Sequence, residues 1–267
     1  MTGPRTRSDR LRQAWVSGAY VIGIVGVLFG VGVLGTRVEE SPGGDLSDDA
    51  TLLAPHGPAF SIWSLIYLLL TAYVIYQWLP GQTSSDRQRR IGWLAGWTLL
   101  LNAAWLLVTQ AGWIWVSVLV IVALAVVLAT VMFRLHIDDS SGLAETLVVD
   151  VTFGLYLGWV LAATGANIGA ALSSSDLGPG RWTAIGLIVS VAIVGGALLR
   201  LFGGRISIAA ALAWGLFWIA YGRLFDEPAD SVVGAVAGVC ALVILAISAS
   251  SQPRAQARPS TRHPLAL

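Results

Sequence analysis

Lysine is absent from the sequence: all 16 basic residues are arginine. The chain therefore has no lysine to hold a phosphate in a P-loop, and none to form a Schiff base as in a retinal-linked pump. Cysteine is nearly absent as well, and the single Cys240 excludes an internal disulfide and a cysteine metal cluster. The three histidines, His56, His136 and His263, lie outside the apolar runs, so we expect no metal site.

Charged residues are scarce. They make up 12% of the 267 residues, whereas 56% are hydrophobic and the mean hydropathy is +0.74. A soluble domain carries about 25% charged residues. The composition therefore excludes a soluble enzyme, a disordered chain and a nucleic-acid binder, and it indicates a polytopic membrane protein.

Eight apolar runs are long enough to cross a bilayer, whose core of about 30 Å needs roughly 20 residues of helix. They predict an all-α fold, a bundle of eight transmembrane helices. Their approximate ranges are 15–35, 58–79, 91–109, 113–133, 146–172, 182–201, 206–221 and 231–248.

The arginines favour one side of the predicted membrane. With the N-terminus in the cytoplasm, 13 of them fall in the inner segments, and Arg37, Arg181 and Arg223 fall in the outer loops. This positive-inside pattern predicts cytoplasmic termini. Because arginine-only, alanine- and glycine-rich usage is typical of GC-rich bacterial genomes, the expected location is a bacterial cytoplasmic membrane.

Acidic residues gather in the longest outer loop, residues 36–57. They are Glu39, Glu40, Asp45, Asp48 and Asp49. The loop also contains glycine and proline, which is typical of a mobile cover. Its spacing lacks the Asp-x-Asp-x-Asp-Gly order of a calcium loop, so a solvated lid is the favoured interpretation.

Aromatic and polar side chains form a stripe on each of three predicted helices. Residues three or four apart share a helix face. The stripes are Phe60, Trp63, Tyr67 and Thr71; Thr98, Asn102, Trp105 and Thr109; and Tyr156, Trp159, Ala163 and Asn167. Asn102 and Asn167 are the only asparagines, and an amide inside an apolar helix is costly unless it has a partner.

The three stripes overlap in the outer half of the bilayer when depth is taken as 1.5 Å per residue. They therefore predict a shared cavity, lined by rings and amides, that opens outward under the loop 36–57. A second interpretation stays open, in which the stripes only hold helices together through hydrogen bonds worth about 0.6 kcal/mol each.

Two titratable residues have competing interpretations. Asp150 lies about one turn inside the fifth predicted span, where a proton relay or a hydrated interfacial carboxylate would fit. His56 lies in the lid before Pro58, where it is either an axial ligand of a metallated ring or an exposed loop histidine.

Three short motifs occur in register on the second, third and fifth predicted helices. Pro55 and Pro58 precede a W-x-x-x-Y motif (Trp63, Tyr67); L-N-x-x-W spans 101–105; and Y-x-x-W (Tyr156, Trp159) is followed by Asn167. Over residues 15–172 the chain resembles the TspO/MBR family of tryptophan-rich sensory proteins and translocator proteins, relatives of the peripheral benzodiazepine receptor.

The resemblance implies a five-helix bundle over residues 15–172, whose pocket binds porphyrins or sterol-like lipids under the loop between the first two helices. It implies that the pocket is lined by Trp63, Tyr67, Asn102, Trp105, Tyr156, Trp159 and Asn167. Phe60 lies on the same stripe as Trp63 and is therefore also expected to line the pocket. Pro55, His56 and Pro58 would belong to the lid. The segment 173–249 would add three helices as a flank, a dimer surface or a second pathway. We expect a basic N-terminus, 1–14, before the bundle and a disordered basic tail, 250–267, after the added helices.

Several positions depart from the family pattern. Leu106 and Leu107 replace Ser-Pro, Thr98 replaces glutamine and Leu155 replaces proline, which makes the predicted pocket more apolar. We therefore expect a sensor, carrier or scavenger of a planar or lipid-like ligand, with tetrapyrrole as a candidate and no required cofactor.

Two other function classes remain open. One is a secondary transporter of a small solute that depends on Asp150, and the other is a structural subunit of a membrane assembly; a homodimer fits any of them. No residues form an evident acid–base pair, which argues against enzymatic turnover.

Overall fold

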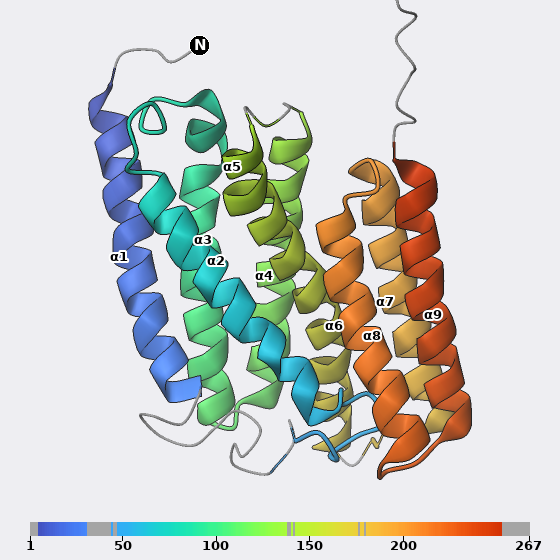
Figure 1. Cartoon of the computed structure of the whole chain (residues 1–267). Helices are drawn as coiled ribbons and strands as arrows, with labels where there is room; N and C mark the ends of the chain where they lie inside the picture. The colour runs from blue at the N-terminus through green and yellow to red at the C-terminus, as the bar shows by residue number, and fades with distance from the viewer. Residues whose placement is uncertain are drawn as a thin grey trace, which may run out of the picture.

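The computed structural model describes residues 5–30, 44, 47–137, 140, 142–175, 177–178 and 180–252. In this part of the chain the regular structure is helical, without strands, and it contains eight helical spans long and apolar enough to cross a membrane. The predicted fold class, an all-α bundle of eight spans, is confirmed. Figure 1 shows the beginning of α1 and the end of α9 at the same face of the bundle.

The helices follow the predicted runs closely. They are α1 (Arg7–Gly30), α2 (Ile62–Tyr76), α3 (Asp86–Gln110), α4 (Ile114–His136), α5 (Leu143–Glu145), α6 (Thr152–Ser173), α7 (Arg181–Leu201), α8 (Ile206–Phe225) and α9 (Ser231–Ser251). A 3-10 turn, Gly57–Ser61, leads into α2, and a π-helical segment, Thr146–Val151, joins α5 to α6.

Two helices begin earlier than the apolar runs predicted. α1 begins with a capping box, in which the Thr6 Oγ1 accepts from the Asp9 N–H at 3.2 Å and an Asp9 carboxylate oxygen accepts from the Thr6 N–H at 2.9 Å. Asp9 also pairs with Arg89 at 2.8 Å, which holds the polar first turns of α1 and α3 together. Hydropathy locates only the apolar part of such a helix. The predicted end of the first span, residue 35, lies outside the described residues.

The helices pack in a chain of neighbours across the bundle. α1 lies along α3, α3 along α4, α4 along α6, α6 along α8, and α9 packs on both α8 and α7. α2 crosses this layer diagonally, so that it runs from the end of α8 toward the beginning of α1 (Figure 1). The last three helices therefore share one continuous core with the first five.

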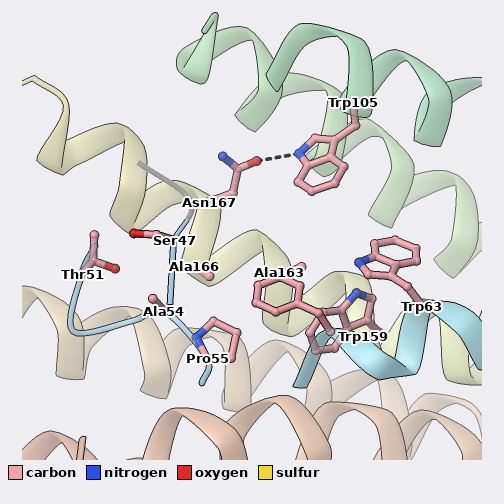
Figure 2. Close-up of a pocket in the computed structure, with 11 residues that line it drawn as sticks. Ser47, Thr51, Ala54, Pro55, Trp63, Trp105, Trp159, Ala163, Ala166 and Asn167 are labelled. Atoms are coloured by element: carbon pink, nitrogen blue, oxygen red, sulfur yellow. Dashed lines mark hydrogen bonds between the residues drawn. The ribbon is translucent and has the colours of Figure 1, made fainter. Parts of the chain in front are cut away.

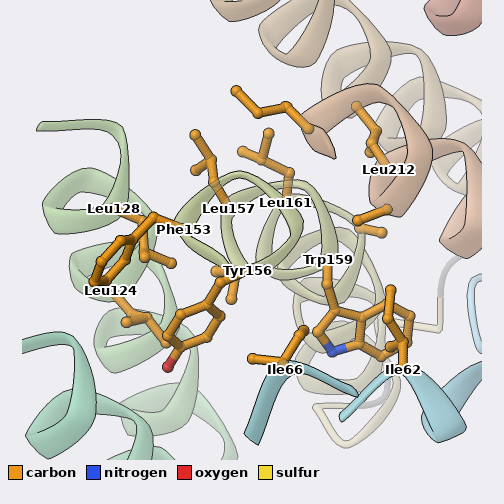
Figure 3. Close-up of a cluster of buried hydrophobic side chains, with 14 of the residues drawn as sticks. Ile62, Ile66, Leu124, Leu128, Phe153, Tyr156, Leu157, Trp159, Leu161 and Leu212 are labelled. Atoms are coloured by element: carbon orange, nitrogen blue, oxygen red, sulfur yellow. The ribbon is translucent and has the colours of Figure 1, made fainter. Parts of the chain in front are cut away.

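α6 is the central helix of the bundle. Its Phe153, Tyr156 and Trp159 are buried among side chains of α2, α4 and α8 (Figure 3). Gly158 lets α8 approach, because a Cβ at that position would lie 2.3 Å from the carbonyl oxygen of Ile208. This close contact fixes α8 beside the residues predicted to bind ligand.

Candidate ligand-binding site

A cavity of about 40 Å³ lies where the segment before α2 passes over α3 and α6. We name residues 47–56 the lid segment and this cavity the lid pocket (Figure 2). The pocket is lined by Ser47, Thr51, Ala54, Pro55, Phe60, Trp63, Trp105, Trp159, Ala163, Ala166 and Asn167. Six of these residues were predicted from the sequence: Pro55, Phe60, Trp63, Trp105, Trp159 and Asn167.

Four aromatic rings contribute to the pocket wall. The Trp63 ring lies roughly parallel to that of Trp105, with centroids 6.3 Å apart, and meets the edge of Trp159 at 6.1 Å. Phe60 contacts Trp159 edge-on at 6.0 Å. These are the stacked and T-shaped arrangements that aromatic pairs prefer. The wall therefore offers ring faces against which a flat ligand could stack.

Asn167 uses its amide within the protein. Its Oδ1 accepts from the Trp105 indole N–H at 2.9 Å, and its Nδ2 donates to the Ser117 Oγ at 2.9 Å. The Ser117 hydroxyl in turn donates to the Ile114 carbonyl at 2.7 Å. The geometry makes Asn167 a positioning residue that fixes the Trp105 ring from α6, with α4 as its support.

Trp159 presents the one fully buried polar atom without a partner that we find on the wall of the lid pocket among the described residues. Its side chain is 1% exposed, and its indole N–H has no hydrogen-bond partner in that part of the chain. An unpaired donor in an apolar interior costs about 1–3 kcal/mol. A ligand with an acceptor atom would remove this cost.

The remaining three residues predicted to bind ligand do not line the lid pocket. Tyr156 is buried behind Trp63 and donates to the Thr98 carbonyl at 3.3 Å. Tyr67 and Asn102 line a second cavity between α1, α2 and α3, where the Asn102 Nδ2 donates to the Tyr67 hydroxyl at 3.1 Å. The single cavity expected from the three stripes is thus divided in two.

The division follows from helix geometry. Trp63 and Tyr67 are four residues apart, which places them about 40° apart around the helix and about 6 Å apart along its axis. Their rings stack at a centroid distance of 5.2 Å, and each faces a different neighbour. The Trp63–Tyr67 stack is therefore the wall between the two cavities.

The lid segment is attached to α8, which sequence reasoning did not associate with the site. Arg223 is 1% exposed and donates to the carbonyl oxygens of Thr51 at 2.8 Å and Asp48 at 3.2 Å. The His56 N–H donates to the Trp218 carbonyl at 3.2 Å. The sequence signal that could have pointed to α8 was the run of aromatic residues over 214–225, because contact with lipid alone does not require so many aromatic rings.

His56 itself lies away from the lid pocket. Its ring packs against Trp218 and Tyr221, and its Nδ1 is 3.3 Å from an Asp226 carboxylate oxygen. Pro58 begins the turn that precedes α2, and its carbonyl accepts from the Ser61 hydroxyl at 2.8 Å. Among the described residues no group of three or more histidine, cysteine or acidic side chains is arranged to hold a metal.

Asp150 belongs to a buried ion cluster at the opposite end of the bundle. Both of its oxygens accept from Arg87, at 2.8 and 3.0 Å, and Arg205 also donates to it. Arg87 lies 3.6 Å from Glu145 as well. The ion pairs of this cluster hold α3, the π-helical segment and the start of α8 together.

The fold and the lid pocket define a multi-pass α-helical membrane protein with an aromatic cavity beneath an inter-helix segment. A family model described as TSPO-like protein matches residues 15–250, and the chain belongs to this family. The resemblance seen over residues 15–172 is confirmed, and the match extends through α7, α8 and α9. No curated protein and no solved structure matches the chain.

Proposed function

We propose that the protein binds a planar, mostly apolar ligand with a hydrogen-bond acceptor in the lid pocket, and that tetrapyrroles are the ligand class. The observation that carries this proposal is the buried, unpartnered indole N–H of Trp159 beside the rings of Trp63 and Trp105. Flat ligands stack on such rings, and a carboxylate or ring-nitrogen acceptor would satisfy the donor.

Binding of such a ligand requires the lid segment to move. A cavity of about 40 Å³ holds only a few water molecules. Sites for larger ligands enclose about 300–1,000 Å³. Residues 47–56 form the wall that is not helical, and hydrogen bonds to α8 hold it in place. Opening of this segment would expose the Trp63 face while the helices stay fixed.

The direction of the opening follows from the arginine pattern. The helix ends that carry Arg87, Arg134, Arg200 and Arg205 lie at the face opposite the lid segment (Figure 1). By the positive-inside rule we assign the lid segment to the extracytoplasmic side of a bacterial cytoplasmic membrane. A ligand would then reach the pocket from outside, as suits a sensor, carrier or scavenger.

The test is an absorbance titration of protoporphyrin IX into the protein in lipid nanodiscs. We expect a saturable shift of the porphyrin band. Trp159→Phe should weaken binding about fivefold, because it keeps the ring and removes one hydrogen bond worth about 1 kcal/mol. Trp218→Phe is the matched control, since the Trp218 indole N–H is also unpartnered among the described residues but lies outside the lid pocket.

Linear, non-saturating absorbance changes would show that the porphyrin only partitions into the lipid. Equal weakening by Trp159→Phe and Trp218→Phe would overturn the assignment of the indole donor. Absorbance is used because each substitution removes a fluorescent tryptophan and would itself alter a quenching signal.

A further inference from the structure

A second cavity opens on the side of the bundle where α1 and α2 diverge. Tyr20 of α1 and Thr71 of α2 are joined by a hydrogen bond of 2.6 Å, and from there the two helices separate toward the lid segment, with α3 behind them (Figure 1). The opening between them has a volume of about 100 Å³. We name it the lateral groove.

Most residues that line the lateral groove are apolar, and the exceptions are Tyr20, Tyr67 and Asn102. Gly23 and Ile24 of α1, Leu70 of α2 and Leu99 of α3 contribute apolar surface, while Tyr67 and Asn102 contribute polar atoms. Ile24 is 41% exposed, so the groove borders the surface that faces lipid. A molecule could enter it directly from the bilayer, without passing the lid segment.

Asn102 has an unmet hydrogen-bonding atom at this groove. The residue is 3% exposed, and its Nδ2 donates to the Tyr67 hydroxyl. Within the described part of the chain its Oδ1 has no partner. Asn102 lies eight residues before Gln110 at the end of α3, which is about 12 Å along the helix and beyond easy reach of interfacial water. An amide oxygen left unpaired at such a depth is costly.

We propose that the lateral groove binds the hydroxyl end of a single-chain lipid, such as a long-chain alcohol, with Asn102 as the hydrogen-bond partner. The hydroxyl would donate to the Asn102 Oδ1, and the first carbons of the chain would lie along Gly23, Ile24 and Leu99. This site is separate from the lid pocket and does not depend on the function proposed for it.

The size and chemistry of the groove select this class of ligand. An apolar cavity of about 150 Å³ accommodates benzene, so a volume of about 100 Å³ takes a short piece of chain and excludes a fused ring system. A hydroxyl can donate to an amide oxygen, and it costs much less to bring into hydrocarbon than a charged group does. A charged headgroup would find no counter-ion among the residues that line the groove.

Photolabelling tests the proposal. The probe is a long-chain alcohol with a diazirine near its hydroxyl, added to the protein in lipid nanodiscs, and labelled peptides are mapped by mass spectrometry. We expect saturable labelling of the α1 and α3 peptides that line the groove. Asn102→Leu should reduce it about fivefold, the factor that corresponds to one hydrogen bond of about 1 kcal/mol.

A steric variant supports the same test without disturbing the amide. A Cβ at Gly23 meets only Leu99, at 3.8 Å or more, so Gly23→Leu should fill the groove without a clash and reduce labelling to a similar extent. Gly18→Leu is its control, because Gly18 has nothing within 4 Å of a Cβ. Both substitutions replace glycine in the same helix, where leucine is the better helix former.

The outcomes separate clearly. The proposal is overturned if a hydrocarbon with the same diazirine labels the groove as well as the alcohol does, or if Gly23→Leu and Gly18→Leu label alike. Labelling that never saturates would mean that the groove holds only water or bulk lipid. Porphyrin binding should remain saturable in Gly23→Leu, so failure of one site is distinguishable from failure of the other.

Discussion

Asn167 shows how a single amide can organise a binding wall without touching a ligand. It connects Trp105 of α3 to Ser117 of α4 from its own position on α6. Both of its side-chain functions are thereby satisfied in an apolar interior, as buried amides require. Its effect on any ligand is through the orientation of the Trp105 ring.

Replacing Asn167 with leucine should destabilise the protein by about 1–2 kcal/mol, because the Trp105 N–H and the Ser117 hydroxyl would both lose a partner. Thermal unfolding in detergent, followed by near-ultraviolet circular dichroism, measures the loss and the altered environment of Trp105. Ser117→Ala, which leaves the Trp105 hydrogen bond intact, should have the smaller effect. A larger effect of Ser117→Ala would contradict the positioning role.

At the residue scale, helical spacing predicted which side chains share a face but not which neighbour that face meets. Trp63, Trp105 and Trp159 came together as the stripes indicated. Tyr67 turned toward α1 because about 40° of rotation is enough to change neighbours. Ser117, the partner of Asn167, belongs to no stripe, so nothing in the sequence pointed to it.

At the scale of single helices, α9 depends on one acidic residue at its start. The Asp230 Oδ1 accepts from the N–H groups of Val232 and Val233, and Oδ2 accepts from Arg181 of α7 at 2.7 Å. The hydrogen bond from Arg181 holds the pKa of Asp230 below its ordinary value, and the backbone hydrogen bonds act in the same direction. Asp230 thus caps α9 and ties it to α7.

The lowered pKa fixes the sign of a pH dependence. Because the folded state favours the ionised carboxylate, its contribution to stability is complete above the unfolded pKa of about 4 and is lost as the pH falls through the lower folded value. Asp230→Asn keeps the cap and removes the charge. The melting temperature of wild type should exceed that of Asp230→Asn at pH 7, and the difference should shrink below pH ~4. A difference that grows on acidification would contradict this assignment.

The ion cluster around Asp150 makes a second prediction at this scale. Asp150→Leu should lower stability by about 3–5 kcal/mol, because it leaves the buried Arg87 and the partly buried Arg205 without their shared partner. The double substitution with Arg205→Met should recover part of the loss, since Arg87 retains Glu145. Unfolding in detergent measures both. Full stability of Asp150→Leu would instead favour a functional carboxylate over the structural one described above.

Most element boundaries could be predicted because each span is a long apolar run, and such runs are unambiguous in a membrane. The extended starts of α1 and α3 could not, since they depend on the ion pair between Asp9 and Arg89, residues far apart in the sequence. The π-helical segment 146–151 also has no counterpart in the hydropathy pattern.

At the scale of the whole molecule, the lid segment is held by a helix more than 160 residues away. Contacts of this separation cannot be derived from local periodicity. They require α8 to lie along α6, a close approach that Gly158 allows near the start of α8. The arginine pattern had assigned Arg223 to an outer loop, whereas the structure buries it against the lid segment. The last three helices therefore contribute directly to the closure of the pocket.

Arg223→Met should loosen the lid segment. It removes the donors to the Thr51 and Asp48 carbonyls while it keeps the side-chain volume. Hydrogen bonds from a charged group contribute about 1.5–3 kcal/mol, so the His56 amide should exchange with deuterium about tenfold faster or more. Arg200→Met is the control, because Arg200 is exposed and makes no ion pair or hydrogen bond among the described residues. Unchanged exchange in Arg223→Met would mean that other contacts hold the segment.

The Trp63 ring lines the lid pocket, the Tyr67 ring lines the lateral groove, and the two rings stack on each other. A guest that tilts Trp63 from the lid side must also disturb Tyr67 and, through its hydroxyl, Asn102. Thermodynamic reciprocity then requires that each occupant alter the affinity of the other by the same factor. The binding of a molecule that arrives from water would then depend on the abundance of a chemically unlike molecule that arrives from the bilayer, and the reverse, because two stacked rings connect their sites.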